Sequence, residues 1–312
     1  MSFSNEEIAI IGEIEHTLDL EGNVEKLKEI SKAAWDGVIE SAAIRSWLGN
    51  FTGDCFGNIK AERNLALWLA LHYSYYTDND IRSLSKNLWW KYVHAQLLSL
   101  DSEEDFKKFT LERKLQYINE ATIIQPLGNA GGSGTNITYF FRQVNGLQET
   151  MFEGTEIEAH RFLVLVDDAT LSGSQATEEM EKYLKYSEST KFLLTFISTN
   201  EAKEKLKEQC RVISAIDIDA RSKCFSTESY VFGQHRNWCS LAKRMCRYYG
   251  KKLDSHNPIG YKNGQYLFSF YYNTPNNTLP IFWQTNNGWA PLFISYYGKN
   301  HEMEGVGIDK YY

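Results

Sequence analysis

The sequence predicts an α/β fold in which a parallel sheet is flanked by helices, with a helical region before the sheet and an extension after it. Three apolar runs carry this prediction, at residues 162–166, 192–197 and 212–218, and segments with helical periodicity lie between them. Continuous apolar runs of this length are typical of strands buried on both faces. Strands that alternate with helices indicate a parallel sheet covered by helices.

Composition supports a folded chain and limits its partners. The 312 residues are 43% hydrophobic, which is enough to bury a sizeable core. The formal net charge is -7 and no basic run is visible, so direct non-specific binding to nucleic acid is not expected. An acidic protein that binds a polyphosphate needs a metal ion or local backbone donors.

The sequence also indicates a cytoplasmic protein that does not bind a membrane. Its first residues lack the basic and apolar regions of a signal peptide, and no apolar run reaches membrane-spanning length. The five cysteines are odd in number and scattered, without a CxxC pair, so we expect reduced thiols.

Three segments are expected along the chain. Residues 1–115 read as a helical N-terminal region, with helical patterns at 6–15, 24–47, 61–75, 81–98 and 103–115. Residues 116–233 carry the α/β core, which begins with an expected strand at 121–127. Residues 234–312 contain an amphipathic helix at 238–249 and an aromatic strand at 266–272.

The most informative stretch is FLVLVDDATLSGSQ, at residues 162–175. An apolar strand is expected to end at Asp167 and Asp168, before a small, hydroxyl-rich turn and a helix. Ligands of α/β sheets bind beyond the carboxyl ends of the strands, and the N-terminus of a helix suits a phosphate. The two acids suit ribose hydroxyls, or a magnesium ion held through water. The alternative is an ordinary strand-to-helix turn in which Asp, Ser and Gly only cap the helix.

This stretch resembles the fingerprint of the type I phosphoribosyltransferases, which has apolar residues, two acids, two variable residues and a hydroxyl-rich loop. The resemblance implies that Asp167 and Asp168 are catalytic and contact the ribose hydroxyls of phosphoribosyl pyrophosphate, with Mg²⁺ as the cofactor. It also implies that the 5'-phosphate lies on Thr170, Leu171, Ser172, Gly173, Ser174 and Gln175. Leu171 and Gln175 depart from the pattern, because hydroxyl residues are usual there.

A second small-residue loop lies in the order that this family requires. Gly131, Gly132, Ser133, Gly134 and Thr135 follow the expected strand at 121–127 and precede an expected helix at 137–144. Successive backbone N–H groups in such a loop can form a nest for an anion, here the pyrophosphate. The alternative is a flexible glycine link.

The helical N-terminal region, the acid pair and a late TPNNTLPIFW segment together resemble the phosphoribosyltransferase-like proteins of prokaryotic conflict systems, including those of some retrons. The resemblance implies an effector or toxin of anti-phage defence, controlled by partners such as a reverse transcriptase or a DNA-binding regulator. It also implies a C-terminal hood in which Asn276, Asn277 and Trp283 receive the acceptor base. The alternative is a structural corner built from Asn and Pro.

One feature argues against ordinary nucleotide synthesis. The usual enzymes bring Lys or Arg to the pyrophosphate on a mobile loop, whereas residues 143–159 contain neither and carry four Glu. Two functions therefore stay open: an enzyme that acts at the ribose C1 of a nucleotide-like ligand, and a non-catalytic module that senses nucleotides and works through protein partners. A housekeeping salvage enzyme is a third, weaker alternative.

Overall fold

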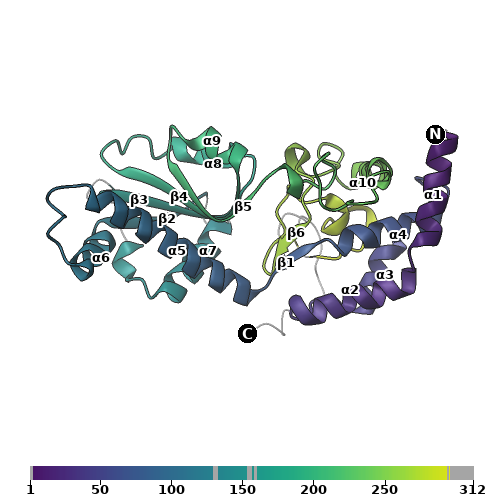
Figure 1. Cartoon of the computed structure of the whole chain (residues 1–312), viewed down its shortest axis with the longest axis horizontal. Helices are drawn as coiled ribbons and strands as arrows, with labels where there is room; N and C mark the ends of the chain where they lie inside the picture. The colour runs from purple at the N-terminus through teal and green to yellow at the C-terminus, as the bar shows by residue number, and fades with distance from the viewer. Residues whose placement is uncertain (1–2, 129–132, 153–156, 158–159, 294, 296–312) are drawn as a thin grey trace. The chain divides into compact units, whose positions relative to one another are not determined.

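The computed structural model describes residues 3–128, 133–152, 157, 160–293 and 295. The chain divides into two compact units (Figure 1). The first unit comprises Met1–Thr77 and Ala220–Tyr312, and the second comprises Asp78–Asp219. Within the described residues, no helix combines the length and the apolar character that crossing a bilayer requires.

The second unit is built on a four-stranded parallel sheet. The strands follow one another in the order β2 (Thr122–Pro126), β3 (Phe162–Thr170), β4 (Thr190–Thr199) and β5 (Arg211–Ile218). Each pair of neighbours is parallel, and helices lie in the connections between them. The predicted fold class, a parallel sheet flanked by helices, is confirmed.

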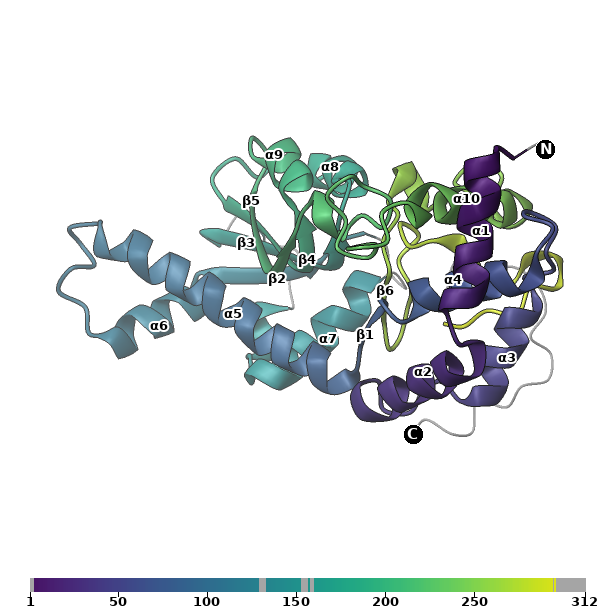
Figure 2. The ribbon, with the colours of Figure 1, turned by 45° about the vertical axis from the view of Figure 1, so that its right-hand side comes forward.

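Helices cover both faces of this sheet (Figure 2). Helices α5 (Asp78–Asp101) and α7 (Ser133–Asn145) pack together on one face, and α8 (Ser174–Glu181) and α9 (Asn200–Leu206) pack on the other. The core under α8 and α9 is apolar and consists of Ile123, Leu127, Ile157, Leu163, Leu165, Ala176, Met180, Leu193, Leu206 and Cys210. Because the strands are buried from both sides, they need the continuous apolar runs that the sequence shows.

Strand β3 is longer than its apolar run. The sequence predicted that the strand ends at Asp167, whereas its pairing with β4 continues to Thr170, which lies opposite Ser198. Asp167 and Asp168 therefore lie inside the strand. The boundary was wrong because the length of a strand depends on its hydrogen-bonded neighbour as well as on hydrophobicity.

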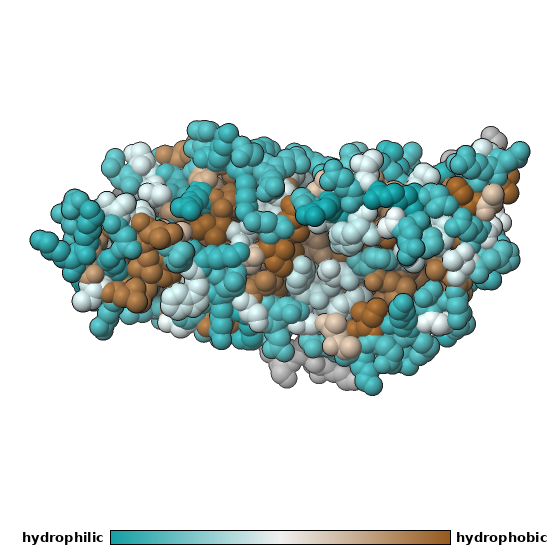
Figure 3. Space-filling model, viewed as in Figure 1, coloured by the Kyte–Doolittle hydropathy of each residue, from teal (hydrophilic) through white to brown (hydrophobic). Residues whose placement is uncertain are grey.

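A second helix boundary also differs from the prediction. The segment at 103–110 forms turns, and helix α6 spans Leu111–Glu120 instead of 103–115. Thr110 explains the start, because its hydroxyl accepts a hydrogen bond from the N–H of Arg113 and so caps the helix. Figure 3 shows hydrophobic side chains at the surface over α5 and α6, and Leu98 and Leu111 are among the exposed residues.

The first unit combines helices from the start of the chain with segments from its end. Its helices are α1 (Asn5–Thr17), α2 (Leu20–Ala34), α3 (Ser41–Gly49), α4 (Ile59–Ala70) and α10 (Trp238–Leu253). A two-stranded parallel sheet joins β1 (Ser74–Tyr76) to β6 (Phe268–Phe270). Strand β1 was missed because the helical pattern of 61–75 continues into it.

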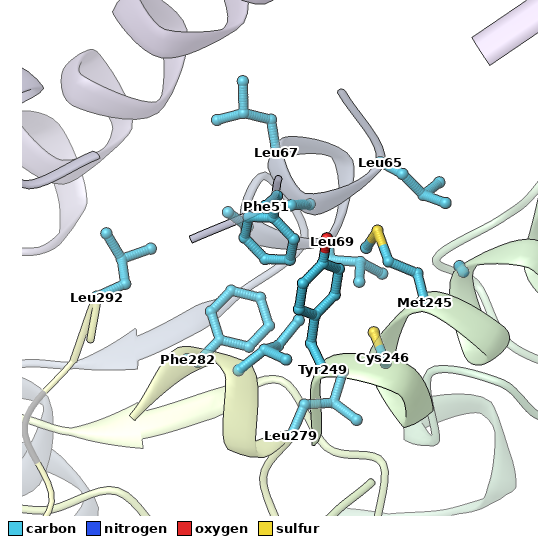
Figure 4. Packing of buried hydrophobic residues seen from close by; sticks show 14 of the residues in the cluster. Phe51, Leu65, Leu67, Leu69, Met245, Cys246, Tyr249, Leu279, Phe282 and Leu292 are labelled. Atoms are coloured by element: carbon cyan, nitrogen blue, oxygen red, sulfur yellow. The ribbon is translucent and has the colours of Figure 1, made fainter. Parts of the chain in front are cut away.

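The units divide the chain differently from the three segments expected from the sequence. Helices α1–α4 pack with the C-terminal part of the chain, whereas α5 and α6 belong with the sheet. Helical periodicity identifies an apolar face but does not say which surface will cover it. In Figure 4, Leu65 and Leu69 lie with Met245, Cys246 and Phe282, which come from segments far apart in the sequence.

A buried carboxylate organises the middle of the first unit. Glu62 is fully buried and accepts hydrogen bonds from the backbone N–H groups of Gly53, Cys55 and Phe56, at 3.0, 2.8 and 2.7 Å. The hydroxyl of Tyr249 on α10 donates to the same carboxylate. A single side chain thus joins the turn at 53–56 to α4 and α10.

We expect Glu62→Gln to destabilise the protein by about 2–3 kcal/mol, because an amide cannot accept four hydrogen bonds at a buried site. The measurement is the free energy of unfolding in urea. Glu29→Gln, at an exposed position with the same change in charge, is the control and should shift it by less than about 0.5 kcal/mol. Equal shifts for the two variants would contradict this role of Glu62.

Candidate functional site

The turn from β3 to α8 is fixed by the neighbouring strand. The hydroxyl of Ser198 donates to the carbonyl of Thr170 at 3.2 Å, and that of Thr199 donates to the carbonyl of Leu171 at 2.6 Å. Thr199 also caps α9, because its hydroxyl accepts the N–H of Ala202. The end of β4 therefore determines where the backbone leaves β3.

Gly173 gives this turn its tight approach to α9. Its φ of 66° lies in the left-handed region, which glycine enters without a steric penalty. A Cβ at this position would lie 3.2 Å from the Cα of Ala202 and 3.4 Å from the Cδ of Lys205. The backbone angle therefore favours glycine here, and a larger residue would also press against α9.

The first turn of α8 presents backbone donors. Gly173 occupies the N-cap position and has no side chain with which to cap the helix. The N–H of Ser174 makes a long contact, 3.4 Å, with the hydroxyl of Ser172. Because the first N–H groups of a helix have no partner inside it and carry its positive dipole end, this turn can bind an anion.

A buried hydroxyl at the end of β3 gives a second, independent indication of a ligand. Thr170 is 3% exposed, and its Oγ1 has no hydrogen-bond partner within the described residues. Leaving a buried hydroxyl unpaired costs about 1–3 kcal/mol. An ordered water or a bound ligand is what normally satisfies such a group.

Asp167 and Asp168 lie before this turn and are 7% and 6% exposed. One carboxylate oxygen of Asp168 accepts the N–H of Ala169 at 2.7 Å. The rise of a strand, about 3.3 Å per residue, separates Asp167 from Thr170 by roughly 10 Å. This spacing leaves room for a sugar between the acids and a phosphate on the turn.

The acids suit a magnesium ion only if the ligand helps to hold it. Within the described ranges, no group of three or more His, Cys, Asp or Glu side chains is placed to hold a metal ion. Mg²⁺ commonly keeps several waters and binds through one or two carboxylates together with substrate phosphates. Asp167 and Asp168 fit this second arrangement.

The predicted pyrophosphate loop falls partly within helix α7. Gly131 and Gly132 lie outside the described residues. Helix α7 begins at Ser133, four residues before the expected start at residue 137. Gly134 and Thr135 therefore belong to its first turn. A Cβ on Gly134 would lie 2.5 Å from the carbonyl oxygen of Leu127 and 3.0 Å from that of Val166. The N-terminus of α7 therefore lies against the residue that follows β2 and against β3 at Val166, directly before Asp167.

Lys205 is a functional candidate that the sequence analysis missed. Its ammonium donates to the hydroxyl of Ser174 at 2.9 Å, which places a positive charge at the first residue of α8. In the sequence, this lysine belongs to a Lys/Glu-rich helix that resembles any solvated surface helix. Only the packing of Gly173 on α9 brings it to the turn.

The residues expected to receive a base form a different kind of structure. Trp283 is 3% exposed and its indole N–H donates to the carbonyl of Thr278 at 3.1 Å. The side chain of Asn277 donates to the carbonyl of Tyr261, and the carbonyl of Asn276 accepts the N–H of Tyr261. These contacts fit the structural Asn/Pro corner, and all of these residues belong to the first unit.

Comparison with known proteins gives one family match. The model of the PRTase-CE family matches residues 44–294. Among solved structures, a match is the orotate phosphoribosyltransferase from Aeropyrum pernix, at 18% identity and a TM-score of 0.24. It covers 33% of this chain and 64% of that enzyme, so this chain spans less than two thirds of the enzyme's length. No curated protein matches the chain.

We expect Gly173→Ala to cost more stability than Gly146→Ala. Both glycines have a positive φ, 66° and 60°, but a Cβ on Gly146 meets nothing within 4 Å. Each variant should therefore lose about 1 kcal/mol of stability because alanine disfavours a positive φ. Only in Gly173→Ala should the new methyl group also press against α9. Urea unfolding of both variants measures the difference, and equal losses would contradict the close approach.

Proposed function

The chain belongs to the PRTase-CE family, and on that premise we propose that it binds phosphoribosyl pyrophosphate or a related nucleotide at the β3–α8 turn and acts at the ribose C1. Its phosphoribosyltransferase-like character rests on the family match. The ligand, the reaction and the residues in their roles are our proposal.

The observation that carries the proposal is a buried hydroxyl that lies close in sequence to a helix start with glycine as its N-cap residue. The Oγ1 of Thr170 lacks a partner within the described residues, and it lies in the segment that leads into the first backbone N–H groups of α8. Lys205 adds a cation at the same turn. Three kinds of phosphate-binding group thus converge on one short segment, although the chain as a whole is acidic.

The proposed roles follow the order of the residues along β3 and the turn after it. The turn holds the 5'-phosphate, and Asp167 and Asp168 accept hydrogen bonds from the ribose hydroxyls. Breaking the bond between C1 and its leaving group develops positive charge on the sugar, and a carboxylate held beside the sugar would stabilise this charge. Fixing the sugar at both ends also lowers the entropy cost of reaching this state.

Magnesium would be held by Asp167 and Asp168, through water, together with the ligand's diphosphate. When bound, the ion supplies charge neutralisation to the leaving pyrophosphate. The protein contributes no Lys or Arg from residues 143–159, as the sequence shows. Arg142, which precedes this segment, pairs with Glu149 at 3.1 Å. The ion therefore has a larger share of this task than in an enzyme with a basic loop.

A non-catalytic sensor of nucleotides is the second candidate function. It would keep the phosphate-binding turn and work through protein partners. The lack of basic residues at 143–159 favours it over ordinary nucleotide synthesis. Turnover separates the two, because only the enzyme would release pyrophosphate or a free base from a bound ligand.

We further propose an effector role in anti-phage defence, on the strength of the resemblance to conflict-system proteins. Its partners would be other proteins of a defence module, such as a reverse transcriptase or a DNA-binding regulator. Expression of the chain alone should then slow bacterial growth, and a variant without the phosphate-binding turn should not. If expression of the wild-type chain changed bacterial growth neither in the absence nor in the presence of phage, this role would be contradicted.

The double variant Asp167→Asn with Asp168→Asn should bind phosphoribosyl pyrophosphate and magnesium at least tenfold more weakly than the wild type, because neutral amides hold neither the ion nor the hydroxyls as well. Isothermal titration calorimetry with and without magnesium is the measurement. Glu188→Gln with Glu208→Gln, two exposed acids of the same unit, is the charge-matched control. Unchanged binding in the Asn variant would contradict the assignment.

Lys205→Gln should weaken binding of ribose 5-phosphate roughly tenfold, because it removes the cation that lies 2.9 Å from Ser174. Titration at two salt concentrations checks this, since a lost ionic contact also reduces the dependence on salt. Lys207→Gln is the control, because Lys207 is paired with Glu204 on the surface. An equal effect of both variants would show that only net charge matters.

A further inference from the structure

Helix α10 in the first unit carries two contrasting faces. Its buried face, which includes Trp238, Met245, Cys246 and Tyr249, belongs to the apolar core. Figure 4 shows Met245, Cys246 and Tyr249 directed toward Phe51 and Leu69. Because this face is buried, the residues on the opposite face of α10 lie at the surface of the unit.

A groove of about 670 Å³ runs along the outer face of α10. Five of its lining residues are cationic. Lys243, Arg247 and Lys251 are spaced four residues apart, so they lie on one stripe of the helix, and Arg244 and Lys252 are each adjacent to a member of this row. The full lining is Cys55, Ser240, Lys243, Arg244, Arg247, Tyr248, Lys251 and Lys252.

Most of this charge is not neutralised by the protein. Arg244 pairs with Glu7 at 3.2 Å, and Lys252 pairs with Asp54 at 3.3 Å. Lys243, Arg247 and Lys251 have no ion-pair partner in the part of the chain that the structure describes. Three uncompensated cations thus gather in a chain whose formal net charge is -7.

The stability of the helix does not account for this row. The helix dipole favours cations only in the last turn, which contains Lys251 and Lys252. Lys243 and Arg247 lie earlier in the helix, where the dipole gives no such benefit. Like charges four residues apart also repel one another by a few tenths of a kcal/mol. The row is therefore better explained by a ligand than by helix stability.

The geometry indicates a ligand with several phosphates in a line. Lys243, Arg247 and Lys251 succeed one another every four residues, or about 6 Å along the helix axis. Tyr248 lies between them and is only partly buried. The ammonium of Lys252 lies 4.5 Å from the centre of its ring. A basic row beside an aromatic face is the pattern with which proteins bind single strands, because bases stack on the ring while cations follow the backbone.

The thiol at the edge of the groove does not oppose an anion. Burial, and next the nearby carboxylate of Glu62, raise the pKa of Cys55 to about 12. The thiol is therefore neutral at pH 7 and adds no negative charge to the groove.

We propose that the α10 groove is a binding site for single-stranded nucleic acid that does not depend on base sequence. This site lies in the first unit and does not rest on the function proposed for the β3–α8 turn. It also revises the expectation, drawn from total charge, that the chain does not bind nucleic acid directly. A local row of cations can attract an anion to an acidic chain, because screening confines electrostatic attraction to about 10 Å at ordinary salt.

The test is fluorescence anisotropy of the full chain with labelled single-stranded oligonucleotides of about 12 nucleotides, as DNA and as RNA, at about 50 mM salt. The variant Lys243→Gln, Arg247→Gln and Lys251→Gln should bind at least tenfold more weakly. The logarithm of the association constant falls linearly with the logarithm of the salt concentration, and the magnitude of this slope should decrease by about 2 when three contacts to a single strand are lost. Tyr248→Ala should weaken binding roughly tenfold through lost stacking, and Tyr248→Phe should not.

The control is Lys26→Gln, Lys32→Gln and Lys60→Gln, which removes the same charge from exposed positions of the same unit. Equal loss in both triple variants, tighter binding to duplex, or equal binding to anionic vesicles would overturn the proposal. So would a wild-type chain that binds no oligonucleotide. Ultraviolet crosslinking of the wild-type chain gives a readout that does not depend on the folding of any variant, and crosslinks outside residues 240–252 would also overturn it.

Discussion

The parallel pairing of β3 with β4 is the constraint on which the candidate site depends. It extends β3 to Thr170 and places Ser198 and Thr199 beside the backbone of the turn, where their hydroxyls hold the carbonyls of Thr170 and Leu171. With the turn held in this way, Gly173 lies against α9 and occupies the N-cap position of α8, where it provides no capping side chain. Without the pairing, the same sequence would be a flexible link with no defined donors.

Sequence reasoning was accurate where a single property decides the structure. The apolar runs of β3, β4 and β5 predicted a buried parallel sheet, and this fold class is confirmed. The residues of the proposed phosphate turn were also identified from their types and order, and their function stays a prediction. These features depend on local chemistry, which can be read directly from the sequence.

The remaining features depend on contacts between distant segments, which no local pattern contains. Asp167 and Asp168 lie inside β3 because β4 pairs beyond the apolar run. Lys205 and Ser174 are 31 residues apart in the sequence, and their side chains meet only because α9 packs on Gly173. Likewise, the parallel pairing of β1 with β6 joins residues near 75 and 269, so a short strand was read as the end of a helix.

The net charge of the chain does not describe its local distribution of charge. The chain is acidic overall, yet each unit concentrates groups that attract anions at one place. In the second unit these are backbone donors, the Thr170 hydroxyl and Lys205, and in the first they are the cations of α10. A compact phosphate suits the short turn, whereas a chain of phosphates suits the row, so geometry distinguishes the two ligands that we propose.

The most direct test of the central claim is a crystal structure of the protein with bound ribose 5-phosphate. The account predicts a phosphate on the turn at 171–175, with the hydroxyl of Thr170 donating to it and the sugar hydroxyls facing Asp167 and Asp168. A phosphate bound elsewhere, with the Thr170 hydroxyl still without a ligand partner, would contradict the account.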